Sequence, residues 1–277
     1  MKLSVAIAAQ DAPDTAFVVW RGIEDSIKKA AGLGFHGVEL ALKDAAEICP
    51  QELDTWLSRS GIEVSCISTG QVFAVSNLYF THPDPDVREN TFQAFRGLVE
   101  LAADHGQLIN VGRARGSYRE KQSRAETERL FIEMAQRICD YGEPKGVTLM
   151  IEPVNRYEIN FINSVEEGAE LLRRVDRPNI GLMPDVFHMN IEDRQIGQTL
   201  IDHADLVRYV HLADSNRNAP GQAHLDFDDV FGALARSGFD GWVSIEILPL
   251  PDPDTAARQA AEFILPRIEK YRPLVPA

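Results

Sequence analysis

The stretch TLMIEPVNRYEINFINSVEEGAELLRRVDRPNIGLMPD, residues 148–185, contains a strand, a helix and a second strand in that order. TLMIEP and IGLMPD are short apolar runs of the kind found in buried strands. Between them, SVEEGAELLRRVD repeats apolar residues at helical spacing, and Ser164 with Glu167 forms a capping-box pattern at the helix start. The stretch therefore predicts two parallel strands joined by a crossover helix.

The same alternation extends through the whole chain. Six more apolar runs complete a set of eight candidate strands: LSVAI near residue 3, GVELA near 37, VSCIST near 64, LINVG near 108, VRYVHLAD near 207 and WVSIEIL near 242. Helical patterns such as RENTFQAFRGLVELAADHG and AETERLFIEMAQRICDYGEPKG separate them. Eight such units predict an α/β fold, a single (β/α)8 TIM barrel with residues 1–277 as one domain. The main alternative is an open doubly wound sheet, but AAQDAPDTAFVVW after the first strand lacks its GxGxxG loop.

Composition limits the partners of the chain. The formal net charge of −14 disfavours nucleic acid, because such a surface repels phosphate backbones. We expect no membrane span, because no apolar run approaches the roughly 20 residues that one needs. The three cysteines form no CxxC motif or Cys/His cluster, which is typical of reduced thiols in a cytoplasmic protein.

Four side chains with ligand chemistry occur where the strands of such a barrel end, which is where its active site lies. They are Glu152 after TLMI, Asp185 after IGLMP, His211 in VRYVHLAD and Glu246 in WVSIEIL. Taken singly, each has a simpler interpretation as a solvated or Arg-paired carboxylate or as a core histidine. Because they recur in the same register on four successive strands, we expect them to converge, and three carboxylates in one place need a cation. Oxygen ligands with one nitrogen favour Mn²⁺, Mg²⁺ or Co²⁺ over Zn²⁺.

The motifs around these residues resemble those of a known family. IEPVNRYE, DVFHMNIE, VHLADSNRNAPGQAHLDF and VSIEIL are similar to the ketose 3-epimerase branch of the xylose-isomerase-like TIM-barrel superfamily, which includes the tagatose and psicose 3-epimerases. The resemblance covers essentially the whole chain. The stretches STGQ, THP and ADSNR followed by APG look closest to the 5-keto-gluconate epimerase type.

This resemblance implies roles for individual residues. It implies one divalent metal ion, with Mn²⁺ first among the candidates, held by the four strand-end residues. It also implies that Glu152 and Glu246 are the acid/base pair, and that substrate oxygens are contacted by His188, Arg217 and Glu158. Homodimers or homotetramers are expected from the family.

The residues themselves fit this chemistry. Epimerisation next to a carbonyl removes a proton from one face of a carbon and returns one to the other face, which two carboxylates can do. A metal would bind the carbonyl and an adjacent hydroxyl and stabilise the enediolate. We therefore expect an isomerase that epimerises a keto sugar or keto sugar acid, at C3 of a ketohexose or the equivalent carbon of 5-keto-gluconate.

Three other functions are alternatives to an epimerase. An aldose–ketose or hydroxypyruvate isomerase would use the same metal and glutamates, and the sequence leaves it open. An apurinic endonuclease of the superfamily would need a three-zinc cluster, for which the strand ends TGQ and VGR provide no histidine. A sugar-binding protein without catalysis would not need two carboxylates flanking a metal.

The loop GRARGSYRE, after the strand near 108, bears on the substrate. Arg113, Arg115 and Arg119 lie close together there in an otherwise acidic chain, and arginines recognise carboxylates and phosphates well. The alternative is a solvated loop. The hypothesis is that Arg113 and Arg115 select an acidic sugar, and that Gln71 in STGQ hydrogen-bonds a sugar hydroxyl.

Overall fold

Parallel strands form the centre of the molecule. The computed structural model describes residues 1–13 and 16–272, so residues 14–15 and 273–277 of the predicted domain lie outside the described part. The main sheet has the order β7-β6-β5-β4-β3-β1-β9-β8. Its strands are β1 (Lys2–Ala8), β3 (Gly37–Ala41), β4 (Glu63–Ser68), β5 (Leu108–Val111), β6 (Thr148–Ile151), β7 (Ile180–Leu182), β8 (Tyr209–Leu212) and β9 (Trp242–Ile245). Isolated parallel bridges between Leu182 and Val207 and between Asp185 and His211 close the sheet, which confirms the TIM barrel.

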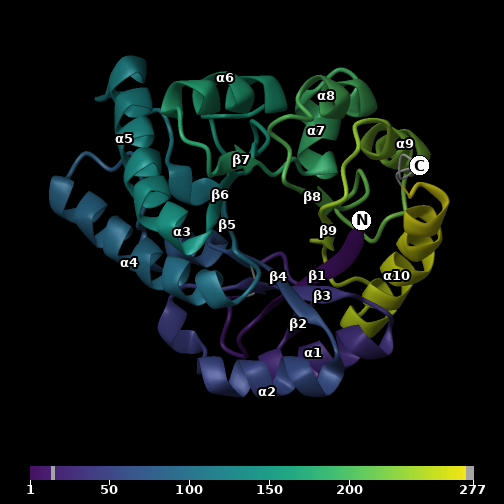
Figure 1. Ribbon diagram of the computed structural model, residues 1–277. Coiled ribbons are helices and arrows are strands. Elements are labelled where there is room, and N and C mark those ends of the chain that lie inside the picture. Colours follow the sequence, from purple (N-terminus) through teal and green to yellow (C-terminus); the bar gives the residue numbers. More distant parts are fainter. Residues whose placement is uncertain (14–15, 273–277) are drawn as a thin grey trace.

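Helices surround this barrel. Figure 1 looks along the barrel, with the strands at the centre and the helices in a ring around them. The helices are α1 (Ile23–Gly32), α2 (Pro50–Ser60), α3 (Gly70–Ser76), α4 (Pro85–Asp104), α5 (Arg124–Gly142), α6 (Val165–Val175), α7 (Val186–Glu192), α8 (Ile196–Asp202), α9 (Phe227–Arg236) and α10 (Pro253–Lys270). Short 3-10 turns are η1 (Ala45–Glu47), η2 (Arg113–Arg115) and η3 (Glu143–Lys145).

One short strand was not anticipated from the sequence. β2 (Trp20–Arg21) pairs in parallel with Ile7 and Ala8 at the end of β1. A strand of two residues is too short to show any periodicity, so its sequence carries no signal that distinguishes it from a loop.

Helix α6 shows how the sequence signals act in the folded chain. Ser164 is the N-cap, and its hydroxyl accepts a hydrogen bond from the Glu167 backbone N–H at 3.2 Å, as the capping-box pattern predicts. The Glu167 carboxylate accepts instead from the backbone N–H of Asn163, one residue before the expected partner. The apolar face, which includes Leu172 and Val175, is buried.

The barrel interior contains a polar network beneath the strand ends. The Tyr209 hydroxyl on β8 lies 2.9 Å from the Ser4 hydroxyl on β1 and 2.7 Å from the Ser65 hydroxyl on β4. Because β4 and β8 are far apart in the sheet order, this contact crosses the inside of the barrel. The same tyrosine packs with Cys66, Met150 and Met183. The barrel centre is therefore filled with side chains, and its floor is fixed by hydrogen bonds.

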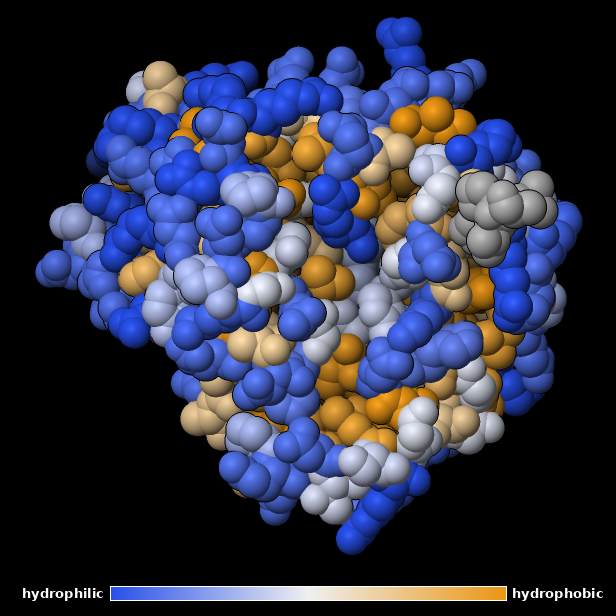
Figure 2. All heavy atoms as spheres, viewed as in Figure 1, coloured by the Kyte–Doolittle hydropathy of each residue, from blue (hydrophilic) through white to orange (hydrophobic). Residues whose placement is uncertain are grey.

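The outer surface is mainly hydrophilic in the view shown. In Figure 2, hydrophilic side chains cover most of the rim of this face, and apolar side chains show mainly nearer its centre. Of the helices in the described residues, none combines the length and the apolar character that crossing a membrane requires.

Candidate metal centre and active-site cleft

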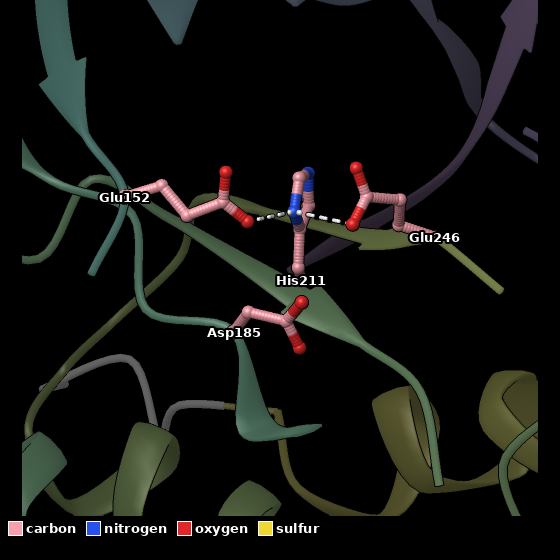
Figure 3. Close-up of side chains that lie close together, drawn as sticks. All are labelled: Glu152, Asp185, His211 and Glu246. Atoms are coloured by element: carbon pink, nitrogen blue, oxygen red, sulfur yellow. Dashed lines mark hydrogen bonds and ion pairs between the residues drawn. The ribbon is translucent and has the colours of Figure 1, made fainter. Parts of the chain in front are cut away.

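The four predicted ligand residues converge at one end of the barrel. One ligand atom from each of Glu152, Asp185, His211 and Glu246 lies within 4.8 Å of the others. Figure 3 shows the His211 imidazole between the carboxylates of Glu152 and Glu246, with the Asp185 carboxylate nearby. Asp185 and His211 are 1% and 0% exposed, so water cannot satisfy these groups and they must satisfy one another or bind a cation.

We expected the four residues at equivalent positions along their strands, and this prediction is wrong in detail. Glu152 and Glu246 directly follow β6 and β9, whereas His211 lies inside β8. Asp185 lies beyond the end of β7 and is the N-cap of α7, where its carboxylate accepts from the Phe187 backbone N–H at 2.9 Å. The residues still meet because β7 is short and the chain continues along the barrel until Asp185 bridges His211.

Arg217 supplies positive charge to this cluster. Its guanidinium donates to Asp185 Oδ2 at 2.5 Å and also to Glu246 Oε2. Arg217 is only 5% exposed, and its φ of 63° lies in the left-handed region that side chains other than glycine adopt rarely. The loop after β8 therefore holds this arginine in an uncommon conformation that directs it into the site, which agrees with its predicted place.

Glu39 is a site residue that the sequence reasoning missed. It lies on β3, is 0% exposed, and its Oε2 is 2.9 Å from His211 Nε2. The Tyr209 hydroxyl donates to the same carboxylate at 3.0 Å. With Nε2–H bonded to Glu39, Nδ1 is the nitrogen that a cation would bind, in place of the proton that it shares with Glu152 at 3.1 Å. The signal was present, because GVELA carries a charge inside an apolar strand.

Two residues near β5 shape the surroundings of Glu152. Asn110 Nδ2 donates to Glu152 Oε2 at 3.2 Å. A Cβ placed on Gly112 would lie 2.8 Å from the same oxygen, which is closer than real Cβ contacts. The absence of a side chain at Gly112 therefore makes room for the carboxylate, and Asn110 fixes its orientation.

The environment of the cluster shifts the pKa values of its members in different directions. Burial raises the pKa of Glu152, but the hydrogen bond and charge of His211 outweigh it and lower the pKa to about 2. Burial raises the pKa of Glu246 to about 8, although His211 and Arg217 oppose it. Burial lowers the pKa of His211, but Glu39 and Glu246 raise it well above its usual value. Three hard carboxylates and one imidazole are a donor set that fits a divalent cation.

A cleft opens onto this cluster. Counted with the open space at its mouth, it has a volume of about 710 Å³. Both Glu152 and Glu246 line it. Of the predicted substrate-contacting residues, five line it as well: His188, Arg217, Glu158, Gln71 and Arg113. The cleft also has apolar walls, which include Phe17 and Val18.

Asn155 links two of these residues. Its Nδ2 lies 2.8 Å from His188 Nδ1 and 3.2 Å from Glu158 Oε1. When Nδ2 donates to Nδ1, the proton of the His188 ring is on Nε2, where it is available to an acceptor in the cleft. His188 is 3% exposed, whereas Glu158 is exposed at the rim. The asparagine thus sets both the orientation and the tautomer of His188.

Gln71, which lines the cleft, carries an unpaired acceptor. Its Nε2 donates to the Ala41 backbone carbonyl, which fixes the amide. Its Oε1 is buried and has no hydrogen-bond partner within the described residues. A buried amide oxygen of this kind is costly unless a ligand or water satisfies it, so its position is consistent with the predicted contact to a hydroxyl.

The prediction for Arg115 is wrong. Its side chain is 0% exposed and donates to three backbone carbonyls, those of Phe161, Gly112 and Ile162, at 2.8–2.9 Å. The guanidinium therefore ties the loop after β5 to the loop after β6 and has no donor directed at a substrate. In the 3-10 turn η2, Arg113 and Arg115 point in different directions, and only Arg113 borders the cleft.

Fold and site together define a TIM-barrel enzyme with a carboxylate-rich candidate metal centre. The family model described as xylose isomerase-like TIM barrel matches residues 27–267, and the chain belongs to this family. The predicted family and the predicted enzyme class, an epimerase and hence an isomerase, are confirmed.

Individual relatives cover most of the chain. A ketose 3-epimerase from Arthrobacter globiformis is 31% identical over 227 residues, which are 81% of this chain and 77% of that protein. An L-ribulose 3-epimerase from Methylomonas is 30% identical over 229 residues, 81% of this chain and 78% of that protein. A crystal structure of a D-allulose 3-epimerase from Methylomonas in complex with D-allulose is 25% identical, with a TM-score of 0.82 over 96% of this chain and 97% of that one.

Proposed function

We propose that this protein is a metal-dependent epimerase that inverts the carbon next to the carbonyl of a keto sugar or keto sugar acid. One observation carries the proposal: the carboxylates of Glu152 and Glu246 face the same cleft from either side of His211, within one group of four ligand-type residues. The relatives named as ketose and ribulose 3-epimerases support the same chemistry.

The reaction needs two groups that exchange protons with opposite faces of one carbon. In the proposal, one of Glu152 and Glu246 removes the proton and the other returns one to the opposite face of the enediolate. A divalent cation held by the four residues, with Mn²⁺ ahead of Co²⁺ and Mg²⁺, would polarise the carbonyl and offset the negative charge that develops on its oxygen.

Other side chains hold these groups in position. Asn110 orients Glu152, and Arg217 holds Glu246 and Asp185. In the proposal, His188, whose ring is fixed by Asn155, donates to a substrate oxygen. The apolar walls of the cleft reduce the access of water, which strengthens each of these electrostatic contacts.

Substitution of the two glutamates tests this assignment. Glu152→Gln and Glu246→Gln should each lower turnover of every accepted keto sugar by at least roughly 100-fold, the range that a general acid or base contributes. Chromatography of the products measures turnover, and circular dichroism checks the fold. Glu170→Gln, on the exposed side of α6, is the matched control and should retain activity. Near-native turnover by either active-site variant would show that the substituted glutamate does not transfer the proton.

The same assay separates the alternatives. An aldose product would indicate an aldose–ketose isomerase with the same site. An apurinic endonuclease is disfavoured, because the described residues contain this one group of potential metal ligands and no second group for further zinc ions. A protein that binds sugars without converting them would give no product with any metal.

Two further features are part of the proposal. We propose that residues 1–277 fold as one domain and that the protein is a homodimer or homotetramer, on the basis of the family resemblance. Multi-angle light scattering of the purified chain measures the oligomeric state directly.

A further inference from the structure

A second cavity adjoins the catalytic cleft. Arg113 and Glu158 line both spaces, so the two are neighbours with a shared wall. With the open space at its mouth, this outer chamber has a volume of about 780 Å³. Its lining includes Phe73, Tyr79, Arg119, Arg156 and Tyr157. The chamber is therefore placed to receive the part of a ligand that extends out of the catalytic cleft.

The chamber carries uncommitted positive charge. Arg156 is neutralised, since it forms an ion pair with Glu192 and donates to both oxygens of that carboxylate. Arg113 and Arg119, in contrast, form no ion pair with any described residue. Both guanidiniums lie on the loop between β5 and α5, in a chain whose net charge is −14. Even with the Glu158 carboxylate at the boundary, the local charge is positive.

Aromatic rings hold these arginines in place. The Arg113 guanidinium lies 5.9 Å from the centre of the Phe73 ring, and that of Arg119 lies 4.8 Å from the centre of the Tyr79 ring. A cation–π contact of this kind attracts a guanidinium to the ring and uses none of its N–H donors. The donors of Arg113 therefore stay available to a ligand that can accept two parallel hydrogen bonds, and Arg119 has further donors besides the one that acts on the Tyr79 hydroxyl.

A buried polar atom in the wall of the chamber is a second observation. Tyr79 is 1% exposed, and its hydroxyl has no hydrogen-bond partner within residues 1–13 and 16–272. The backbone next to it is tightly packed, since a Cβ on Gly116 would clash with the Thr81 hydroxyl at 1.9 Å. The wall is thus closely packed, and Arg119 lies beside this hydroxyl, since its positive charge opposes the rise in the pKa of Tyr79 that burial causes.

The position of Arg113 sets the distance between the two sites. The preceding residue, Gly112, lies so close to the Glu152 carboxylate that an added Cβ would be 2.8 Å from Oε2. Glu152 and Arg113 line the same cleft, so one ligand in it can lie against both residues.

We propose that the outer chamber is an anion subsite, which binds a carboxylate or phosphate on the end of the keto sugar remote from the reacting carbon. The proposal rests on the epimerase function and narrows its substrate to acidic or phosphorylated keto sugars. Arg113 and Arg119 bind the anion, whereas Arg115, which is committed to backbone carbonyls, has no part in it.

Substrate preference tests the subsite. The values of kcat/KM for a keto-hexonate, a ketohexose 6-phosphate and a neutral ketohexose would be measured for the native protein, Arg113→Gln and Arg119→Gln. We expect each variant to lower the ratio of anionic to neutral kcat/KM by about 10-fold or more, the range of a charge-assisted hydrogen bond. The two anionic substrates show whether carboxylate or phosphate is preferred.

Arg124→Gln is the matched control. Arg124 stacks on the Tyr118 ring at the same 4.8 Å, but the chamber lining does not include it. This variant should leave the ratio unchanged. If Arg113→Gln and Arg119→Gln also leave the ratio unchanged, or if Arg124→Gln lowers it equally, the subsite is refuted.

Binding without turnover separates failure of the subsite from failure of the proposed function. Titration calorimetry with gluconate and with inorganic phosphate would be repeated on the same four proteins. Weaker binding to Arg113→Gln and Arg119→Gln alone supports the subsite even if no sugar is epimerised. Equal binding to all four, or none to any, overturns it whatever the outcome of the activity assays.

Discussion

Glu39 offers a sharp test of how the candidate metal centre is assembled. The change is Glu39→Gln, which keeps the size of the side chain and removes its charge. In the native protein the Glu39 carboxylate lies 2.9 and 3.1 Å from His211 Nε2 and accepts from the Tyr209 hydroxyl at 3.0 Å. The amide oxygen of Gln can accept one of these hydrogen bonds. Its NH₂ group, which can only donate, then faces a second donor where the native protein has a carboxylate oxygen.

The expected loss follows from these contacts. A hydrogen bond to a charged group contributes about 2 kcal/mol and a neutral one about 1 kcal/mol, so the difference is about 1 kcal/mol or slightly more. At about 1.4 kcal/mol for each factor of ten, the dissociation constant of Mn²⁺ should increase roughly 5- to 10-fold. Loss of a partner that orients a metal-bound histidine commonly has an effect of this size or larger.

The assay is calorimetric titration of the metal-free protein with Mn²⁺, at pH 8 to limit competition from protons. Glu63→Gln is the control, because Glu63 lies at the exposed start of β4 and pairs with Lys2 at the surface. It should bind Mn²⁺ like the native protein. A dissociation constant for Glu39→Gln within twofold of the native value would refute the idea that Glu39 positions His211.

Three further predictions concern the loop after β5 and the end of α7. Gly112→Ala should lower turnover by about 10- to 100-fold with the fold retained, because the added Cβ displaces the Glu152 carboxylate; steady-state kinetics and circular dichroism check this, and unchanged kinetics would contradict it. Arg115→Met should lower the free energy of unfolding by roughly 3 kcal/mol, since it leaves three carbonyls without donors. Urea denaturation measures this. A loss below about 1 kcal/mol would contradict the idea that Arg115 holds the loops after β5 and β6 together. Burial raises the pKa of Asp193 to about 7, so its charge destabilises the fold above that pH and the penalty fades as the pH falls toward 4. Asp193→Asn should therefore raise Tm at pH 8 and change it little at pH 4, and an equal shift at both values would contradict the assignment.

The fold was readable from the sequence because its signals are repeated. Strand and helix alternate along the chain, and helix starts such as Ser164 add local signals that agree with the pattern. The strand β2 was missed because two residues show no period. The precise place of Asp185 was missed because strand length decides it, and β7 ends at Leu182, earlier than its apolar run suggests.

Site residues could be predicted from the sequence where a charged side chain stands at the end of an apolar strand. Glu152 and Glu246 stand out as charges that follow apolar strands. Glu39 has the same property, but it lies within its strand, and only the structure shows that His211 is its partner. Arg113 and Arg115 look equivalent in sequence, and the turn of the 3-10 helix separates them into one residue at the cleft and one in the interior.

Deuterium exchange tests the central claim most directly. The purified protein would be incubated with Mn²⁺ in D₂O with a neutral ketohexose, a keto-hexonate and a ketohexose phosphate, and NMR would follow the C–H beside the carbonyl. The account predicts entry of deuterium at that carbon together with formation of its epimer, and loss of both in Glu152→Gln and Glu246→Gln. Absence of exchange with every sugar, with and without the metal, would contradict it.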